Sequence, residues 1–112
     1  MAEHRTQVLK GVLDVCLLAL IAEEPSYGYE MVEKLGSRGL PLVADGSIYP
    51  SLSRLQNRGL AEGYFEEHGG GPPRKYYRIT AAGRDRLDEW TEEWETLSSG
   101  VDRVLGGRRS DG

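Results

Sequence analysis

The chain has 112 residues, enough for one domain, and its 38% hydrophobic and 29% charged residues are typical of a soluble globular protein. Its formal net charge of −4 argues against a protein that merely coats nucleic acid. Cys16 is the only cysteine, which excludes an intrachain disulfide, and the longest apolar run, residues 15–22, is much shorter than the ~20 residues that span a bilayer. Asp14 beside that run also argues against a signal peptide, so we expect a cytoplasmic protein.

Charge is distributed unevenly along the chain. Residues 47–84 carry six basic side chains against three acidic ones, a net charge of +3. Residues 85–102 carry one basic side chain against seven acidic ones, a net charge of −6. The chain is therefore polarised, with a basic middle segment and an acidic segment after it.

Residues 6–22 are predicted to form the first helix, because apolar side chains recur at the spacing of one helical face. This stripe consists of Leu9, Val12, Leu13, Cys16, Leu17 and Leu20. Val8, Val15 and Ala19 add a second apolar flank. A helix that is apolar on more than one side is buried on more than one side, which favours contact with a partner subunit. We interpret Cys16 as a core residue rather than a nucleophile, because it lies in the main stripe.

The second helix is predicted over residues 27–35, with Ser26 as its N-cap. Gly28 lies inside this helix and costs ~1 kcal/mol relative to alanine, which is most useful where another backbone or a phosphate approaches closely. Residues 36–44 are expected to form a turn and an extended link before a third helix. The order helix, turn, helix indicates a helix-turn-helix module.

The third helix, predicted over residues 45–60, has one apolar and one polar side. At ~100° per residue, Ile48, Leu52 and Leu55 fall together on the apolar side. The outer face near the N-terminus consists of Ser47, Tyr49, Pro50, Ser53 and Arg54. These groups can enter a DNA major groove without steric conflict, with Arg54 as the main charged contact. Considered alone, an ordinary amphipathic helix with a solvated face is the other interpretation.

Proline and glycine predict the two ends of this third helix. Proline is tolerated in a first turn, where its missing N–H would have no partner, so Pro50 favours Ser47 as the N-cap, with Asp45 as the alternative. Gly59 is expected to follow the helix as a C′ glycine.

A β-hairpin is predicted next, with strands at residues 60–65 and 74–80 joined by a glycine-rich tip. A hairpin beside such a helix forms a wing. We expect Arg74 and Lys75 to contact DNA phosphates from this wing, as Tyr27 does from the second helix.

The last helix is predicted from the cap residue Thr80 to about residue 105. Its apolar residues follow alternating steps of three and four, the heptad spacing of a helix that packs against a partner helix. They are Leu87, Trp90, Trp94, Leu97, Val101 and Val104. Together with Val8, Val12 and Val15 they are expected to form a dimer interface; packing on the chain's own domain is the alternative. Residues 106–112 are expected to be a disordered tail.

Four stretches, YGYE at 27–30, GSIYPSLSRL at 46–55, GL at 59–60 and RKYYRITAAGRDRL at 74–87, are similar to the PadR-like transcriptional repressors in their short form. The resemblance implies a mainly α fold with a small β-hairpin. Residues 1–80 would be a winged helix-turn-helix domain that binds DNA and 81–105 a C-terminal dimerisation helix. It also implies a homodimer that binds palindromic promoter DNA.

The resemblance further implies that Trp94 helps to enclose a flat aromatic effector between subunits. We expect Trp90, one turn earlier on the same seam, to help hold this effector. A tryptophan pair is wide for a two-helix seam and would splay the helices, leaving an apolar slot in which planar ligands can stack. Asp88, Glu89 and Glu93 nearby would favour cationic ligands. Ordinary packing of the tryptophans in a dimer interface is the alternative.

An enzyme is not expected, because His4, His68 and Cys16 cannot be combined with an orienting group into a catalytic site. No cluster of metal ligands is apparent in the sequence, and no cofactor is predicted. The competing function is a winged-helix protein that binds another protein through its acidic last helix, without sequence-specific DNA binding.

Overall fold

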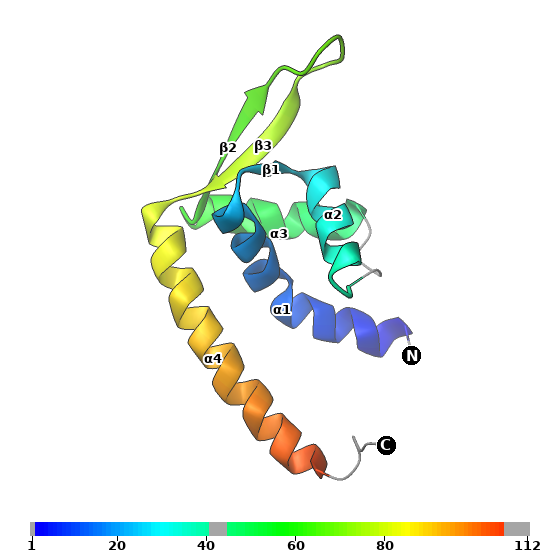
Figure 1. Ribbon diagram of the computed structural model, residues 1–112, viewed down its shortest axis with the longest axis vertical. Helices are drawn as coiled ribbons and strands as arrows, with labels where there is room; N and C mark the ends of the chain where they lie inside the picture. The colour runs from blue at the N-terminus through cyan, green and yellow to red at the C-terminus, as the bar shows by residue number, and fades with distance from the viewer. Residues whose placement is uncertain (1, 41–44, 107–112) are drawn as a thin grey trace.

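The computed structural model describes the backbone of residues 2–40 and 45–106 and the side chains of residues 12–40 and 48–106. Four helices and three short strands follow one another along this part of the chain (Figure 1). They are α1 (Ala2–Glu23), β1 (Ser26–Tyr27), α2 (Gly28–Ser37), α3 (Asp45–Asn57), β2 (Ala61–Glu66), β3 (Arg74–Ile79) and α4 (Ala81–Leu105). The fold is therefore mainly helical with a small sheet. Of the predicted link and tail, residues 41–44 and 107–112 lie outside the described residues.

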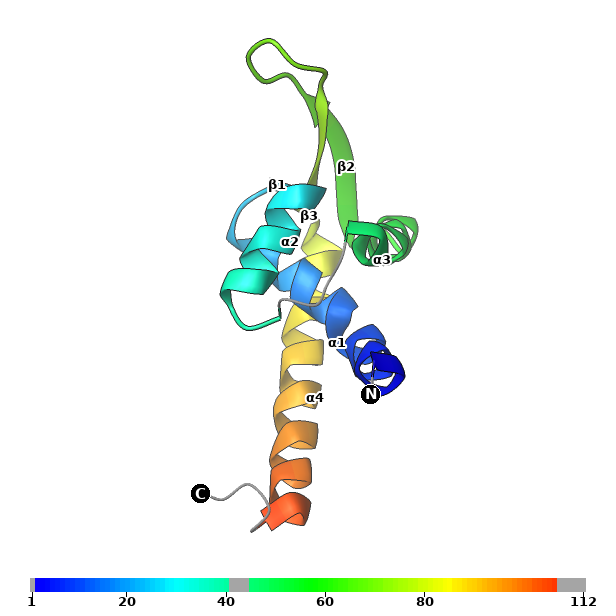
Figure 2. The ribbon, with the colours of Figure 1, turned by 90° about the vertical axis from the view of Figure 1, so that its right-hand side faces the viewer.

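The molecule is elongated, with extents of 54, 29 and 21 Å. Helices α1, α2 and α3 pack together in the middle, the hairpin of β2 and β3 projects from one end, and α4 runs away toward the other (Figures 1 and 2). None of the described helices combines the length and the apolar character that crossing a membrane requires.

The core lies between α1, α2 and α3 and is closed by the base of the hairpin. Its fully buried apolar residues are Leu17, Leu18, Ile21, Met31, Ile48, Leu52 and Leu55. Three of them, Ile48, Leu52 and Leu55, are those that the helical angle predicts for the apolar side of α3. Burial of each such side chain contributes ~1.5–3 kcal/mol to stability, which fixes the side that α3 turns inward and therefore the side that it leaves exposed.

The sheet contains three antiparallel strands in the order β1–β3–β2, one more than the predicted hairpin. Tyr64 of β2 lies opposite Tyr76 of β3, and Ser26 of β1 lies opposite Tyr77 on the other side of β3. Strand β1 is missing from the sequence prediction because two residues are too few to show an alternating pattern.

The prediction of Ser26 as the N-cap of α2 is wrong. Ser26 is buried in β1, where its Oγ donates a hydrogen bond to the carbonyl of Glu24 (3.1 Å) and accepts one from Lys34 Nζ (3.0 Å). Helix α2 begins two residues later, and the Glu30 carboxylate accepts a hydrogen bond from the Tyr27 backbone N–H at 3.1 Å. This acidic group satisfies one of the N–H groups that a helix start leaves unpaired.

The predicted N-caps of α3 are also wrong. The helix already includes Asp45, so neither Asp45 nor Ser47 precedes it, and Pro50 lies in the second turn rather than the first. Because proline has no N–H, the helix forgoes one backbone hydrogen bond there. The side chain of Ser47 lies outside the described residues.

Helix α3 ends at a C′ glycine, Gly59, as predicted. Gly59 adopts a positive φ of +74°, and the N–H of Leu60 donates a hydrogen bond to the carbonyl of Leu55 at 2.9 Å. This is the geometry of a Schellman motif, in which glycine tolerates the left-handed conformation that ends the helix.

Thr80 caps α4, as the sequence predicts. Its Oγ1 accepts a hydrogen bond from the Gly83 N–H (3.0 Å) and donates one to the carbonyl of Gly59 (2.7 Å), while its own N–H donates to the carbonyl of Leu60 (3.1 Å). These bonds connect the end of α3 directly to the start of α4.

Candidate nucleic-acid interface

We call the hairpin of β2, β3 and the loop that joins them the wing. Beside the base of the wing, the outer side of α3 presents a small, mostly uncharged surface. Pro50, Ser53 and Arg54 are exposed on this side, and 48% of Tyr49 remains exposed. The structure thus places four of the five predicted groove-facing residues outside the core. The fifth is Ser47, whose side chain is not described.

Tyr49 also packs against the start of α2. A Cβ atom added to Gly28 would lie 2.6 Å from the Tyr49 hydroxyl and 3.0 Å from Cζ of its ring, closer than side chains approach one another. Glycine at position 28 therefore makes room for a ring from α3, where the sequence suggested a backbone or a phosphate. This contact holds α2 against α3 within the helix-turn-helix.

Arg54 is held by Asp14 of α1. The Asp14 carboxylate accepts hydrogen bonds from Arg54 Nη2 at 2.8 Å and from Arg54 Nε at 3.2 Å, and it also accepts one from the buried Ser51 hydroxyl. The hydrogen bond to Asp14 and its negative charge raise the pKa of the Arg54 guanidinium above its ordinary value. The contact between Asp14 and α3 was not predicted from the sequence. The signal for it is a carboxylate within an apolar helical stretch, because a largely buried charge needs a hydrogen-bonding partner.

Three tyrosine rings form a row on one face of the sheet, with an arginine at each end of the row. The Arg74 guanidinium carbon lies 4.5 Å from the centre of the Tyr27 ring, and the Tyr27 and Tyr76 rings meet edge to face with centres 5.4 Å apart. Tyr76 stacks on Tyr64 at 5.9 Å, and Arg78 lies 4.6 Å from the centre of the Tyr64 ring. The structure therefore brings together Tyr27 and Arg74, two of the residues predicted to contact phosphates.

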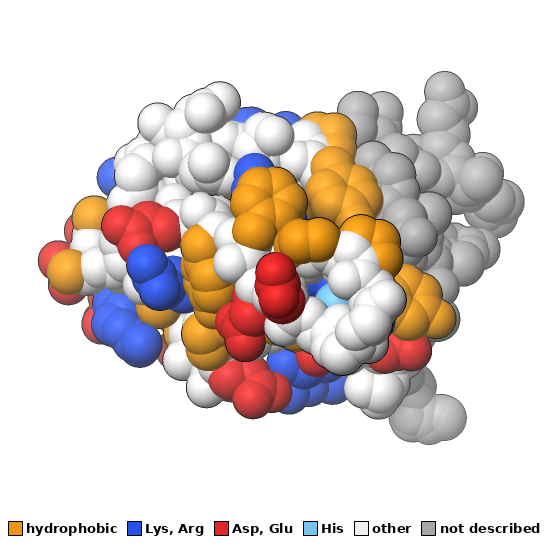
Figure 3. Space-filling view, turned by 90° about the horizontal axis from the view of Figure 1, so that it is seen from above, with side chains coloured by type: hydrophobic (Ala, Val, Ile, Leu, Met, Phe, Trp, Pro, Cys, Tyr) orange, Lys and Arg blue, Asp and Glu red, His pale blue; other side chains and the backbone are white. Residues whose placement is uncertain are grey.

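The basic residues of β3 differ in what they contact. Arg78 pairs with Glu62 across the hairpin at 3.0 Å, whereas no carboxylate pairs with Arg74 or Lys75 among the described side chains. Lys75 lies on the opposite face of the strand, 5.3 Å from the centre of the Tyr77 ring. Seen from the wing end, acidic, basic and apolar side chains are interspersed, so this end of the molecule is not a uniformly basic surface (Figure 3).

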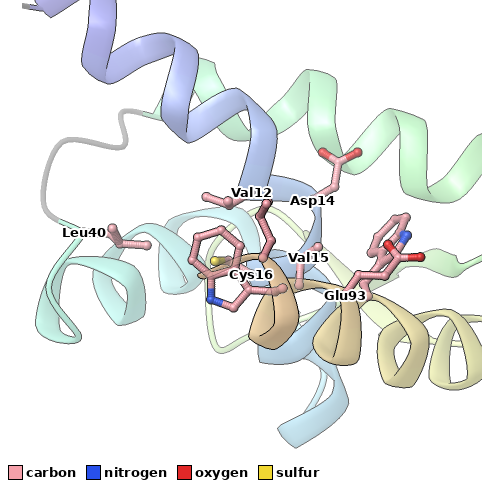
Figure 4. A pocket seen from close by; sticks show the side chains of 9 residues that line it. Val12, Asp14, Val15, Cys16, Leu40 and Glu93 are labelled. Carbon is pink, nitrogen blue, oxygen red and sulfur yellow. The ribbon is translucent and has the colours of Figure 1, made fainter. Parts of the chain in front are cut away.

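A cavity of about 520 Å³ lies between α1 and α4 (Figure 4). Its lining consists of Val12, Asp14, Val15, Cys16, Leu40, Trp90, Glu93, Trp94 and Leu97. Burial raises the pKa of the Cys16 thiol, which favours the neutral form and fits its interpretation as a packing residue. Of the three acidic residues predicted to favour a cation, Glu93 lines this cavity, and Glu89 instead pairs with Arg86 at 3.3 Å.

The two tryptophans have different surroundings. Trp90 packs partly against the core, and the Arg86 guanidinium carbon lies 5.6 Å from its ring centre. Trp94 lies one turn further along α4 and remains 49% exposed. Of the two tryptophans predicted to hold an effector, Trp94 is therefore the more accessible.

The heptad seam of α4 divides into two parts. Leu87 and Trp90 pack against the chain's own core, which is the alternative considered for the whole seam. Beyond them the seam is exposed, and we call its exposed residues the α4 strip: Trp94, Leu97, Val101 and Val104. Val12 and Val15 face the cavity, while the side chain of Val8 lies outside the described residues.

Comparisons with known proteins agree with this architecture. Residues 17–89 match the Transcriptional regulator PadR-like family. A PadR-like transcriptional regulator from Bacillus cereus is 44% identical, with a TM-score of 0.80 over 90% of this chain and 98% of its own. A PadR family transcriptional regulator from Eggerthella lenta is 33% identical, with a TM-score of 0.80 over 93% of this chain and 90% of its own. An uncharacterised protein of Lysinibacillus sphaericus is 31% identical over 105 residues, which are 92% of this chain and 96% of its own length.

The family match includes the end of α1, β1, α2, α3, the wing and the first part of α4, whereas most of α1, residues 2–16, precedes it. Members of this family regulate transcription by binding DNA and are not enzymes. The chain belongs to the PadR-like family of transcriptional regulators.

Proposed function

We propose that this regulator is a repressor that binds a palindromic promoter site as a homodimer and releases it when a small planar effector binds. The polar outer face of α3 at the foot of the wing carries the proposal. A helix of this kind reads base edges in a major groove while neighbouring cations contact phosphates.

The residues fall into two groups by role. Tyr49, Pro50, Ser53 and Arg54, with Ser47, face the bases, because α3 turns Ile48, Leu52 and Leu55 toward the core. Tyr27, Arg74 and Lys75 contact phosphates, which fix the position of the protein on the duplex without reading sequence.

The α4 strip supports a homodimer. Its four apolar residues follow heptad spacing and remain exposed on a helix that leaves the body of the protein (Figure 2). A second copy of the same helix offers the complementary seam, since identical subunits bury the same surface on both sides of a two-fold axis. A two-fold dimer requires two half-sites of matching symmetry, hence a palindromic operator.

The cavity between α1 and α4 supports an effector site. It is lined mainly by apolar side chains with Trp94 accessible at its edge, and a planar molecule can stack on the exposed indole. Because α4 carries both the cavity wall and the dimer seam, occupancy would alter the spacing of the two recognition helices and lower the affinity for DNA.

The experiment selects binding sites from a pool of random DNA duplexes with the purified protein and measures affinity for the selected site at increasing salt. We expect a palindromic site, two chains bound per site, and a loss of affinity of roughly 100-fold between 50 and 200 mM salt if the two wing cations of both subunits contact phosphates. A protein that enriches no sequence and shows no salt dependence would instead be the protein-binding module considered as the alternative.

A further inference from the structure

Asp14 is an acidic residue of α1 whose side-chain hydrogen bonds go to α3. It lies in α1 between Leu13 and Val15, and its side chain is 19% exposed. Its carboxylate binds the Ser51 hydroxyl and the Nε and Nη2 groups of Arg54, both residues of α3. In Figure 4 the carboxylate points toward α3 and away from the side chains that surround the cavity. The contact therefore acts on the recognition helix rather than on α1 itself.

The arrangement leaves one edge of the guanidinium unused. Asp14 occupies the edge formed by Nε and Nη2, whereas Nη1 takes no part in the pair. The Arg54 side chain remains 46% exposed on the outer face of α3. Arginine reads guanine by donating from its terminal nitrogens to the O6 and N7 acceptors in the major groove. The outer edge of Arg54 is thus available for such a contact while the inner edge stays bound to Asp14.

We propose that Asp14 is a positioning residue for base recognition, which aligns the Arg54 guanidinium to read a guanine; this inference rests on the proposed function of α3. Arginine has a long and flexible side chain, and fixing its planar group before DNA arrives reduces the conformational entropy that recognition costs. The buried Ser51 hydroxyl holds the Asp14 carboxylate in turn, so the guanidinium is oriented through two layers of hydrogen bonds.

The negative charge of Asp14 also has a cost for binding. A carboxylate close to the DNA surface repels phosphates, and this repulsion weakens binding to every sequence alike. Asp14 therefore exchanges part of the non-specific affinity for discrimination between sequences. If Asp14 only joined α1 to α3, replacing it would not raise the non-specific affinity while lowering the discrimination between sequences.

The test compares affinity for the site selected by the wild-type protein with affinity for a scrambled duplex, at one salt concentration. In Asp14→Ala, the ratio of the two affinities should fall by about 5- to 140-fold for each bound chain, the range for loss of one base contact, while affinity for the scrambled duplex stays the same or rises. Arg54→Ala should lower the ratio by at least as much. Adding Asp14→Ala to Arg54→Ala should lower it no further, because the aspartate acts through the arginine.

Two further variants control for folding and for charge. Asp14→Asn keeps a hydrogen-bonding group of the same shape and should retain part of the discrimination, and it decides the matter if Asp14→Ala does not fold. Glu23→Gln breaks a similar two-bond pair, in which Glu23 at the end of α1 binds Arg38 at the end of α2 with both distances at 2.8 Å, away from α3. It should leave the ratio unchanged.

The outcomes separate the inference from the proposed function. A wild-type protein that selects no sequence refutes the proposed function and the inference with it. A wild-type protein that selects a site while folded Asp14→Ala and Asp14→Asn retain its full discrimination refutes the inference alone. Equal losses on the selected and the scrambled duplex would assign Asp14 to fold stability instead.

Discussion

Arg74 and Lys75 are neighbours in sequence but leave β3 on opposite faces. Arg74 lies against the Tyr27 ring at the start of α2, and Lys75 lies against Tyr77 on the other face. Stacking on tyrosine keeps each cation close to the wing, since a cation over an aromatic ring is stabilised by ~0.5–1 kcal/mol at an exposed site. The wing therefore offers positive charge along both of its faces rather than at a single point.

Replacing both Arg74 and Lys75 by alanine should weaken binding to all DNA sequences alike. Each lost phosphate contact reduces the slope of log affinity against log salt by about one, so we expect a decrease of about two for each bound chain. The measurement is fluorescence anisotropy with selected and scrambled duplexes over a series of salt concentrations.

Arg78→Gln is the matched control for the wing. Arg78 belongs to the same strand but already pairs with Glu62, so its loss should change the slope much less. An altered sequence preference with an unchanged salt slope in the double variant would contradict a phosphate-contacting role.

For single residues, the sequence predicts which side chains α3 exposes but not which partners they bind. Helical periodicity separates Ile48, Leu52 and Leu55 from Arg54, because burial of the apolar residues fixes the rotation of the helix. The partner of Arg54 is Asp14, forty positions earlier on another helix. No local pattern encodes such a distant pair, since it depends on how α1 and α3 pack in three dimensions.

Hydrogen bonds and close backbone packing constrain the connection between the end of α3 and the start of α4. Thr80 bonds to Gly59, Leu60 and Gly83, and Gly83 itself is buried. A Cβ atom on Gly83 would overlap the carbonyl oxygen of Leu60 and lie 2.7 Å from Ile79 Cγ1. Glycine thus lets the first turn of α4 lie directly on the backbone that ends α3, which fixes the direction in which α4 leaves the domain.

Gly83→Ala should destabilise the protein. The added methyl group meets backbone, which cannot move aside as a flexible side chain can, and such overpacking costs about 1–3 kcal/mol, more than the ~1 kcal/mol that alanine gains over glycine in a helix. Thermal unfolding followed by circular dichroism should therefore show a melting temperature several degrees below that of the wild type.

Gly100→Ala provides a control on the same helix. Among the described residues beyond the neighbouring turns of α4, no atom lies within 4 Å of a Cβ built at Gly100, so alanine there should raise the stability through helix propensity alone. A Gly83→Ala protein as stable as Gly100→Ala would show that the close packing of α4 on Leu60 does not constrain the fold.

Helices could be predicted from the sequence where apolar periodicity extends over several helical turns. The predicted helices agree with the observed ones to within four residues at each end, because apolar periodicity and the glycine and threonine caps are strong local signals. The predictions failed at Ser26 and Pro50. Pairing with β3 draws Ser26 into the sheet, and packing keeps α3 helical before Pro50 despite the missing hydrogen bond.

At the scale of the whole molecule, α4 connects the wing to the α4 strip. Helix α4 starts at the end of the wing, passes the cavity beside α1 and then extends away from the domain (Figure 1). Heptad spacing in the sequence predicted an apolar seam along α4 but could not predict that its first residues, Leu87 and Trp90, pack on the chain's own core. That division depends on where α4 loses contact with α1, which is a property of the tertiary structure.

A dimer through the α4 strip should be sensitive to a single buried charge. Leu97→Glu would place a carboxylate in an apolar seam opposite its symmetry mate, so we expect a monomer in sedimentation velocity at concentrations where the wild type is a dimer. The site lies outside the domain core, since Leu97 is 60% exposed, and the circular dichroism of the domain should remain close to that of the wild type. A wild-type protein that sediments as a monomer at micromolar concentration would refute the dimer.

Binding of a planar cationic ligand should depend on Trp94. The Trp94 indole is half exposed at the edge of the cavity, and Glu93, which no basic residue pairs with among the described side chains, lines the same space. Stacking on the indole and attraction by the carboxylate both favour a flat cation, and a dimer would bring two such sites together.

Titration of the DNA-free protein with an acridine dye should quench tryptophan fluorescence. In Trp94→Ala the affinity should fall about tenfold or more, while Trp94→Phe, which keeps an aromatic face, should lose less. Trp90 remains in both variants as the reporter, so quenching of Trp90 with unchanged affinity in Trp94→Ala would place the ligand elsewhere. If no planar dye quenches the wild type, the exposed indole serves the dimer seam alone, and the spacing of the recognition helices is set by packing rather than by a ligand.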